Sequence, residues 1–549
     1  MPSNTSKDLT TDQKIALTPL VQHLSAVSLK DVLGICHDLR EGSELSAGEK
    51  SALRHLLEGE ETLTLSPHPW LQECCTLATD DGEVPIDAGT WQLIIASLLI
   101  RSGQWMELKQ LELDCTPAIR YSGVVSTQLS QLQELTLYEW RAKDLSAFQS
   151  MNQLTHVSFR TPSACAEELI DALLVLMEKA PNLNEIDLPW VDPESLIALA
   201  RHPSLFDLVE AGCAHYPTHD FLLRYTQRQL DEHEQEIPKE RLSRLLELGS
   251  RICRFHTRWI GDCPLREVYC PPGVFWMGTD EQAEWLKGVS PSHQVRISHG
   301  LWIAQLPLSN RIVEFFDKEL PDGFPGGRDE VCKQLGWLNS IRMSNLLSAH
   351  FSLEPAYTMH LMHYTPEDLD LKASGYRMLT EAEWEYAAQW GGKYKFSGSD
   401  HYELVAHTFR NHRFDSSIDI LTGEDIVERT QSWPLVKSHL RSATLRANAL
   451  GMYDMSGLLA EWCNDILDLD VYATRATSSP IPSDPVVFPS KRRKSSPSLG
   501  PMTYVVSRGG SYNYWENTAL NVSRREDFPT DRWTCANGLR VCRVAEDPE

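Results

Sequence analysis

The stretch Ser507-Arg-Gly-Gly-Ser-Tyr-Asn-Tyr-Trp-Glu-Asn-Thr-Ala519 decides the fold of the C-terminal half of the chain. Between Gly510 and Asn537 the sequence is rich in aromatic and arginine residues. Such side chains bury a large area at small entropic cost and are enriched at interface hot spots. The alternative is that they only pack the domain. We expect a ligand-binding or partner-binding surface formed by Tyr512, Asn513, Tyr514, Trp515, Glu516, Asn517, Arg525, Asp527 and Trp533.

Other motifs surround this stretch in a fixed order. They are Val268-Tyr-Cys-Pro-Pro-Gly-Val-Phe-Trp-Met-Gly-Thr-Asp280, Gly375-Tyr-Arg-Met-Leu-Thr-Glu-Ala-Glu-Trp-Glu-Tyr-Ala-Ala388, Asn448-Ala-Leu-Gly-Met-Tyr-Asp-Met-Ser-Gly457 and Asn537-Gly-Leu-Arg-Val-Cys542. Together they resemble the formylglycine-generating enzyme family, also called the sulfatase-modifying factor family. The resemblance covers residues 261–549 and implies a C-type-lectin-like fold: a small twisted sheet, two helices and much irregular loop. Within it, Thr380-Glu-Ala-Glu383 predicts a capped helix start.

The resemblance also bears on catalysis. In catalytic members of the family, two cysteines shortly after the Gly-Gly-Ser bind copper(I) and drive oxidation of a substrate cysteine. The matching positions here hold Tyr514 and Ala519, and neither side chain is a thiolate ligand. Cys535 and Cys542 match the family's closing core strand, so we expect them to be structural. The resemblance therefore implies no catalytic residue and no copper. A metal-dependent oxidase or hydroxylase with a relocated site is the alternative.

Calcium is the cofactor that the resemblance implies. By motif position, Asp454 and Glu461 would supply side-chain oxygens, and Gly457 and Leu459 would supply backbone carbonyls. Oxygen donors of this kind suit a hard cation. The alternative is that the two carboxylates bond protein groups without a metal.

Upstream, a leucine-rich pattern with strand periodicity predicts repeats. Their first residues lie 24, 22, 29 and 22 positions apart, a spacing typical of leucine-rich repeats with one strand each. Helices are expected between the strands, for example over residues 166–180. The alternative is an ordinary α/β segment with coincidental spacing. The pattern occurs in Leu108-x-x-Leu111-x-Leu113, Leu132-x-x-Leu135-x-Leu137, Leu154-x-x-Val157-x-Phe159, Leu183-x-x-Ile186-x-Leu188 and the weaker Leu205-x-x-Leu208.

These patterns predict an α+β protein of several domains. Apolar residues at helical spacing favour a helical N-terminal cap over residues 1–104. The leucine-rich-repeat-like α/β solenoid follows over 105–215, a helical connector over 216–260, and the formylglycine-generating-enzyme-like domain over 261–549. Within this last domain, residues 475–502 are rich in proline and serine and contain Lys491-Arg-Arg-Lys494, which indicates a disordered insertion.

Composition narrows the classes of function. The 549 residues carry a formal charge of −25, so general binding to nucleic acid is not expected. The 13 cysteines are scattered without a CxxC pair, which favours a reducing compartment. The N-terminal residues do not read as a secretory signal. The longest apolar stretch, residues 91–100, is short of the roughly 20 residues of a membrane span. We expect a cytoplasmic protein that does not enter a membrane.

A non-catalytic recognition or adaptor protein fits these features best. It would work in a bacterial signalling or defence system and bind partner proteins, such as a protease or a signalling protein. Both the repeat region and the C-terminal lectin-like face would take part. Besides the oxidase, the alternative is a ligand-binding receptor whose sequence is diversified by a retroelement. In some relatives with this fold, the residues that match the aromatic-rich and arginine-rich segment between Gly510 and Asn537 are hypervariable.

Overall fold

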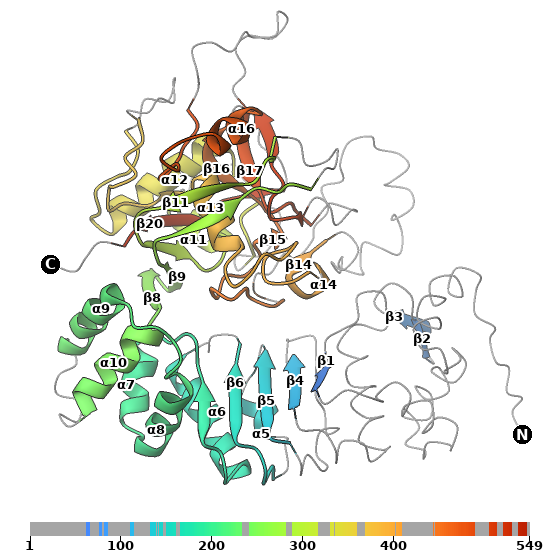
Figure 1. Cartoon of the computed structure of the whole chain (residues 1–549), viewed down its shortest axis with the longest axis vertical. Coiled ribbons are helices and arrows are strands. Elements are labelled where there is room, and N and C mark those ends of the chain that lie inside the picture. Colours follow the sequence, from blue (N-terminus) through green and yellow to red (C-terminus); the bar gives the residue numbers. More distant parts are fainter. Residues whose placement is uncertain are drawn as a thin grey trace, which may run out of the picture. The chain divides into compact units, whose positions relative to one another are not determined.

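The computed structural model divides the chain into two compact units, Met1–Cys253 and Arg254–Glu549, which are described separately. Figure 1 shows the elements of each. No helix in the described ranges is long and apolar enough to cross a bilayer. The described residues are 62–65, 76–79, 82–85, 110–114, 132–138, 140, 142–146, 150–160, 165–232, 241–281, 288–316, 330–333, 335–358, 368–400, 402–408, 443, 445–488, 504–512, 520–529 and 536–545.

A five-stranded parallel sheet organises the first unit. Its strand order is β1-β4-β5-β6-β7, and every neighbouring pair runs parallel. The register places Leu111 beside Leu135, then Val157, then Ile186. The last three side chains are fully buried, whereas Glu134 is exposed, because alternate residues of a strand point to opposite faces. The strands are β1 (Thr62–Leu65), β4 (Gln110–Asp114), β5 (Glu134–Tyr138), β6 (His156–Phe159) and β7 (Glu185–Asp187).

Strands therefore form at four of the five leucine-rich segments. The fifth prediction is wrong, because Leu205-x-x-Leu208 lies in a helix that begins at Pro203 and buries Leu205 and Val209 at helical spacing. The helical prediction for residues 1–104 is also wrong where it can be compared. Its described parts are β1 and a hairpin of β2 (Thr76–Thr79) and β3 (Gly82–Pro85). The rest of that range lies outside the described residues.

Helices complete the first unit. Helix α6 buries Leu169, Leu173 and Leu176 at helical spacing, and its bounds agree with the helix predicted over 166–180. Helices α9 and α10, from the segment predicted as a connector, pack with each other and with α7. Residues 233–240 of this segment lie outside the described residues. The helices are α5 (Ala142–Ser146), α6 (Ala166–Lys179), α7 (Pro193–Ala200), α8 (Pro203–Gly212), α9 (Asp220–Asp231) and α10 (Leu242–Ile252).

Two sheets form the second unit. The first is antiparallel, with the order β13-β20-β12-β9-β8. The second has the order β18-β17-β16-β19, in which β16 and β19 are parallel. Their strands are β8 (Phe255–Ile260), β9 (Cys263–Cys270), β12 (Leu301–Ala304), β13 (Arg377–Met378), β16 (Ala460–Ile466), β17 (Tyr504–Arg508), β18 (Glu526–Pro529), β19 (Asn537–Gly538) and β20 (Val541–Val544).

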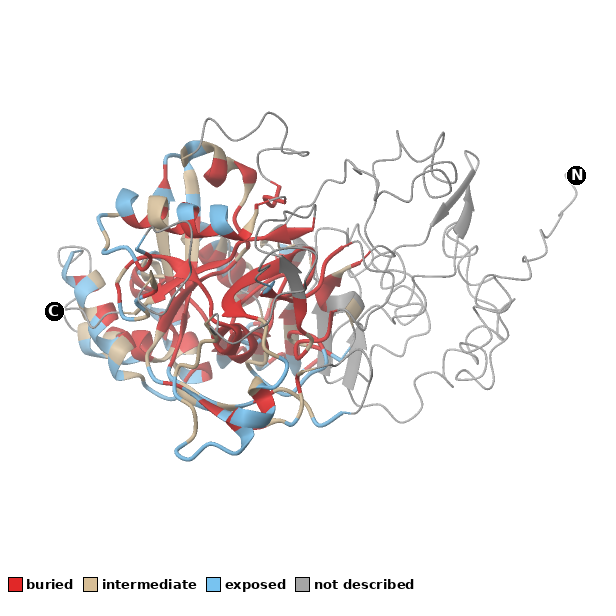
Figure 2. Ribbon diagram, turned by 90° about the horizontal axis from the view of Figure 1, so that it is seen from above, coloured by how far each residue is buried: buried red, intermediate tan, exposed pale blue. Residues whose placement is uncertain are grey.

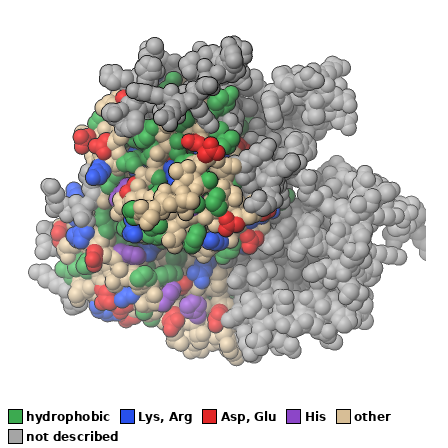
Figure 3. All heavy atoms as spheres, turned by 45° about the horizontal axis from the view of Figure 1, so that its top comes forward, with side chains coloured by type: hydrophobic (Ala, Val, Ile, Leu, Met, Phe, Trp, Pro, Cys, Tyr) green, Lys and Arg blue, Asp and Glu red, His purple; other side chains and the backbone are tan. Residues whose placement is uncertain are grey.

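In the described part of the second unit, two short pairs of strands and five helices accompany these sheets. Trp337, Trp384 and Trp462 are almost completely buried in the second unit. In Figure 2 the buried residues fill the strands, and the exposed ones lie on loops and outer helix faces. On the face drawn in Figure 3, hydrophobic, acidic and basic side chains are interspersed, so charge of one sign does not dominate it. The remaining elements are β10 (Gly273–Met277), β11 (His293–Ile297), β14 (Ala406–His407), β15 (Ser456–Gly457), α11 (Asn310–Phe316), α12 (Trp337–His350), α13 (Glu381–Ala388), α14 (Tyr402–Val405) and α16 (Val471–Ala476).

Part of the segment predicted to be disordered has a defined place. Residues 475 and 476 are the last two of α16, and residues 477–488 follow it. The amide of Val487 donates to Asp465 Oδ1 at 2.9 Å. The amide of Ile466 in turn donates to the Val487 carbonyl at 2.9 Å. One of these bonds is to a side chain and the other joins two backbone groups, and both hold the segment. The prediction of disorder is therefore wrong for residues 475–488. Residues 489–502, with the basic run, lie outside the described residues.

Candidate functional site

Helix α13 places three glutamates in the interior of the second unit. Its start is fixed by the predicted capping box, in which the Thr380 hydroxyl accepts from the Glu383 amide and the Glu383 carboxylate accepts from the Thr380 amide. Glu381, Glu383 and Glu385 are each at most 1% exposed. Glu383 forms a two-pronged ion pair with Arg377, with both N–O distances 2.7 Å. Buried carboxylates of this kind require a cationic partner.

Arg508, the last residue of β17, is the partner of the other two glutamates. Its Nη2 donates to Glu381 Oε1 at 2.9 Å and to Glu385 Oε2 at 2.7 Å. The same nitrogen donates to the Tyr472 hydroxyl at 2.8 Å, and Nη1 donates to the Val522 carbonyl at 2.7 Å. Arg508 is fully buried. It therefore joins β17, α13, α16 and the chain after residue 520 at a single point.

The pKa values of the carboxylates follow from their partners. Burial alone would raise the pKa of Glu381, but the charges of Arg525 and Arg508 outweigh it and lower that pKa. For Glu385 burial outweighs the charge of Arg508, and its pKa is raised. Asp465 accepts from the Glu381 amide at 2.7 Å, and burial together with the charge of Glu381 raises its pKa to about 6. The cluster thus depends on its arginines to keep negative charge inside the protein.

The turn after Arg508 leads directly into the predicted binding strip. Gly509 has a φ of +91°, and a Cβ there would lie 3.0 Å from the Met455 carbonyl oxygen and 3.1 Å from the Trp384 ring. A left-handed backbone in this space requires glycine. The Tyr512 amide then donates to the Leu458 carbonyl at 3.1 Å. The backbone of this turn is therefore fixed on both sides up to residue 512.

Two residues of the predicted binding surface are buried. Tyr512 is 5% exposed and belongs to an apolar cluster that includes Leu458 and Leu459. The Arg525 side chain is 1% exposed, and its Nε lies 2.6 Å from Glu381 Oε1. Its Nη1 donates to the Gly288 and Asp468 carbonyls at 3.0 and 2.8 Å. The prediction that Tyr512 and Arg525 contact a ligand is wrong, because both side chains have their partners inside the domain.

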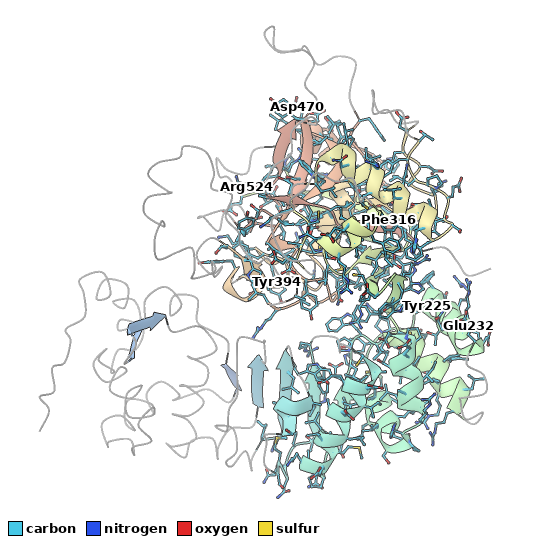
Figure 4. The ribbon with its side chains drawn as sticks, turned by 180° about the vertical axis from the view of Figure 1, so that it is seen from behind. Tyr225, Glu232, Phe316, Tyr394, Asp470 and Arg524 are labelled. Carbon is cyan, nitrogen blue, oxygen red and sulfur yellow. The ribbon has the colours of Figure 1, made fainter. Side chains whose placement is uncertain are left out.

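The other predicted contacts are less closely defined. Asp527 lies in β18, opposite Val506 of β17. Arg524, labelled in Figure 4, precedes this strand by two residues, and its Nε is 3.9 Å from Glu526 Oε1. The remaining predicted contacts lie outside the described residues: Asn513, Tyr514, Trp515, Glu516, Asn517 and Trp533.

Comparison with known protein families shows which family the C-terminal half of the chain matches. Residues 263–545, just over half of the 549, match the family described as the sulfatase-modifying factor enzyme 1-like domain. The chain belongs to this family. The match begins at the first residue of β9 and ends one residue after β20. It therefore includes both sheets except for the edge strand β8.

Similar proteins have also been found individually. The chain is 32% identical over 163 residues to a protein named chaperone protein LppX from Paenibacillus barcinonensis. That match covers 26% of this chain and 54% of the relative, so the chain spans about half the length of that relative. Among solved structures, Treponema denticola variable protein 1 is 19% identical, with 53% and 99% of the two chains covered and a TM-score of 0.39. PvdO from Pseudomonas aeruginosa is 17% identical, with 53% and 98% covered and a TM-score of 0.37.

The calcium ligands implied by the family fit the structure in part. Both carboxylates are buried, and Asp454 Oδ2 accepts from the Ala443 amide at 2.8 Å. Burial raises the pKa of Asp454 to about 6, as expected for a carboxylate with too little positive charge nearby. Glu461, however, is already paired: its Oε1 lies 2.6 Å from Arg540 Nη2, and its Oε2 accepts from Trp384 Nε1 at 2.7 Å. Asp454 thus fits a calcium ligand, whereas Glu461 fits only as a ligand shared with an arginine. The site stays a prediction.

The backbone carbonyls of the same site lie in a tight turn. Gly457 has a φ of +75°, and its amide donates to the Gly509 carbonyl at 2.8 Å. Leu458 has a φ of +60°, and Leu459 is fully buried. This turn and the turn at Gly509 are therefore bonded to each other.

Sequence reasoning missed the partners of Arg508. The arginine was visible in the opening motif, and Glu381 and Glu385 were visible in the capped helix. The signal that could have joined them is the alternation of three glutamates in one short helix whose residues are otherwise alanine and aromatic. Residues two apart in a helix point in different directions, so three alternating glutamates do not share one solvated face. A carboxylate that points into the protein needs a cation.

Proposed function

We propose that the chain is a non-catalytic recognition protein of a bacterial signalling or defence system, acting as an adaptor that binds partner proteins. The observation that carries this proposal is the sequence after the fixed turn. The positions that match the family's two catalytic cysteines hold Tyr514 and Ala519. The turn itself is anchored by Arg508 and by the Tyr512 amide. The family's framework is thus retained at a place where its thiolates are replaced by residues suited to binding.

The chemistry of the other thiols supports the same proposal. Copper(I) chemistry of this kind needs thiolates. Burial raises the pKa of Cys270, Cys463 and Cys542, and it raises that of Cys332 to about 12. These four side chains are buried, and the fifth described cysteine of the second unit, Cys263, is half-buried at the start of β9. The four buried cysteines belong to the core and are poor candidates for a relocated copper site.

The first unit would supply a second binding surface. We infer that its parallel strands belong to a leucine-rich-repeat solenoid, because four strands coincide with the repeated leucine pattern. Repeats of this kind present extended surfaces to proteins. We also infer that the second unit has the C-type-lectin-like fold implied by its family. A partner that is itself a protease or signalling protein is consistent with the absence of an enzyme motif elsewhere in the sequence.

The compartment is inferred from the thiols. The eight cysteines that the structure describes are all free, and most are buried. Free thiols in this number favour a reducing compartment such as the cytoplasm.

The experiment is affinity capture of partners from the native host with the full chain. The test variant is Trp515→Ala combined with Trp533→Ala. The matched control is Trp259→Ala combined with Trp276→Ala, two tryptophans that are 59% and 45% exposed elsewhere on the second unit. We expect the partners captured by the wild type to be lost with the first pair and kept with the second. Equal capture by all three proteins would overturn the proposed surface.

Catalysis is tested in parallel. The purified chain is assayed for bound copper and iron and for oxygen uptake with a cysteine-containing peptide. We expect no turnover above that of the free metal ions. Turnover that requires the folded chain would replace recognition with the oxidase alternative.

A further inference from the structure

A groove lies between two neighbouring helices of the first unit. It runs between α6 and the following helix α7 and encloses about 590 Å³. Residues of both helices line it at helical spacing, so one face of each helix points into the same space. The lining residues are Ala166, Glu167, Ile170, Asp171, Glu194, Ile197, Ala198 and Arg201.

The floor of the groove is apolar. Ile170 and Ile197 are 8% and 4% exposed, and Ala166 and Ala198 are half-buried beside them. Leu174 lies one turn beyond Ile170 on α6 and is 44% exposed. Ala166, Ile170 and Leu174 therefore form a stripe along one face of α6 whose far end is open to solvent. Leu174 thus extends the apolar stripe of α6 beyond the residues that line the groove.

The rim is acidic. Glu167, Asp171 and Glu194 are exposed, and Arg201 is the single basic residue among those lining the groove. In the part of the chain that the structure describes, no ion pair neutralises any of the three carboxylates. Glu167 and Glu194 lie in the first turns of their helices, where they also stabilise the helix dipole. Asp171, in the second turn, lacks that explanation.

We propose that this groove binds a cationic amphipathic helix of a partner protein. An apolar floor between two helices accepts one apolar stripe of a third helix. The three acids on the rim would then face Lys or Arg residues that flank this stripe. This inference rests on the proposed role of the first unit as a binding surface, and it names the chemistry of the partner.

The probe is a fluorescein-labelled peptide of about 18 residues, long enough to form a helix on binding. Its leucines stand at positions i, i+3, i+4 and i+7, and its other positions are lysine and alanine. A second peptide with glutamate in place of lysine has the same apolar stripe. Binding to the full chain is followed by fluorescence anisotropy at two salt concentrations. We expect the lysine peptide to bind, more weakly at the higher salt, and the glutamate peptide not to bind.

Charge reversal locates the site. The test variant carries Asp171→Lys and Glu194→Lys. The control carries Asp220→Lys and Glu232→Lys, which change the net charge equally but lie at the two ends of α9, where Figure 4 labels Glu232. We expect about tenfold weaker binding in the first variant, because each ion pair becomes a repulsion, and a change of less than about twofold in the control. Equal losses in both would show adsorption to a chain of charge −25 and would overturn the groove.

The apolar floor is tested by a second pair of variants. Leu174→Ser removes the exposed end of the stripe, and Leu223→Ser removes a leucine of similar exposure, 41%, on α9. Both leucines are partly exposed, so neither change should unfold the unit. We expect weaker binding for Leu174→Ser alone. If no peptide binds while capture through Trp515 and Trp533 persists, the groove inference fails and the proposed function stands.

Discussion

Replacing Arg508 with Met tests whether the buried charge cluster holds the second unit together. Methionine has about the length of the arginine stem but cannot donate to Glu381 or Glu385. Both carboxylates are fully buried, with distances of 2.9 and 2.7 Å to the same Arg508 nitrogen. The Val522 carbonyl and the Tyr472 hydroxyl lose their donor as well.

The size of the effect follows from burial. Removing one partner of a buried ion pair typically costs about 3–5 kcal/mol, because a charge is left without compensation. Arg525 remains beside Glu381, so most of the loss falls on Glu385. We therefore expect Arg508→Met to lower the free energy of unfolding of the second unit by about 4 kcal/mol. The matched control is Arg311→Met, since Arg311 pairs with Asp262, whose side chain is 78% exposed. An exposed pair of this kind contributes about 0–1 kcal/mol.

The measurement has to be specific to the second unit. A chain of two units does not unfold in one step, so a single midpoint would mix them. Hydrogen exchange at the amides of β16 and β17 reports the opening of the sheet that Arg508 anchors. We expect exchange there to accelerate strongly in Arg508→Met and to change little in Arg311→Met. Adding Glu385→Gln to Arg508→Met should restore most of the lost protection, because the carboxylate that is left without a cation is gone while Arg525 still pairs with Glu381.

The pH dependence gives a separate check. Without Arg508 the pKa of Glu385, which is already raised, rises further above its unfolded value, and the pKa of Glu381 rises from its lowered value. The folded variant then binds more protons than the unfolded chain, so its stability increases as pH falls from 7 towards 5. The difference in stability between Arg508→Met and the wild type should therefore become smaller as the pH falls from 7 to 5. If Arg508→Met loses less than about 1 kcal/mol of stability at pH 7, or if the loss of stability does not vary with pH, then Arg508 does not compensate the two buried carboxylates as described.

Three other perturbations address the turn and the predicted calcium site. Gly509→Ala should cost about 1–3 kcal/mol, measured by exchange at β17, because φ is +91° and the new methyl group would lie 3.0 Å from a carbonyl oxygen. In the presence of a chelator, Asp454→Asn should be more stable than the wild type above pH 6, and this difference in stability should disappear towards pH 4. The reason is that the pKa of Asp454 in the folded protein, about 6, exceeds the unfolded value, so Asp454 destabilises the fold only when it is ionised. Added calcium should slow exchange around Asp454 in the wild type and not in Asp454→Asn, and the absence of any difference would remove the predicted metal.

Some of the fold could be read from sequence because the signals were local. The leucine pattern placed β4 to β7, since alternation along a strand depends on adjacent residues only. Thr380 and Glu383 placed the start of α13 through a capping box contained in four residues. The same local reasoning failed at Leu205-x-x-Leu208. Two leucines three positions apart suit a helix as well as a strand, and Pro203 favours the helix.

The candidate site was less predictable because its contacts are long-range. Arg508 and Glu381 are 127 positions apart in sequence, and Arg525 and Gly288 are 237 positions apart. An arginine in a motif rich in aromatic residues is predicted to be exposed and to contact a ligand, unless a buried carboxylate partner is known. Arg525 was assigned to the surface for that reason, and Tyr512 because its apolar neighbours, Leu458 and Leu459, come from another part of the chain.

The bonds of the buried arginines explain how this framework can tolerate new loops. Arg540 donates to the carbonyls of Ala304, Gln305 and Tyr453, and Arg525 donates to those of Gly288 and Asp468. These acceptors are backbone atoms, and all of them lie outside residues 513–519. These particular bonds therefore involve no atom of that segment. Under the proposed function, a chain can exchange a pair of cysteines there for binding residues without disturbing the buried ion pairs.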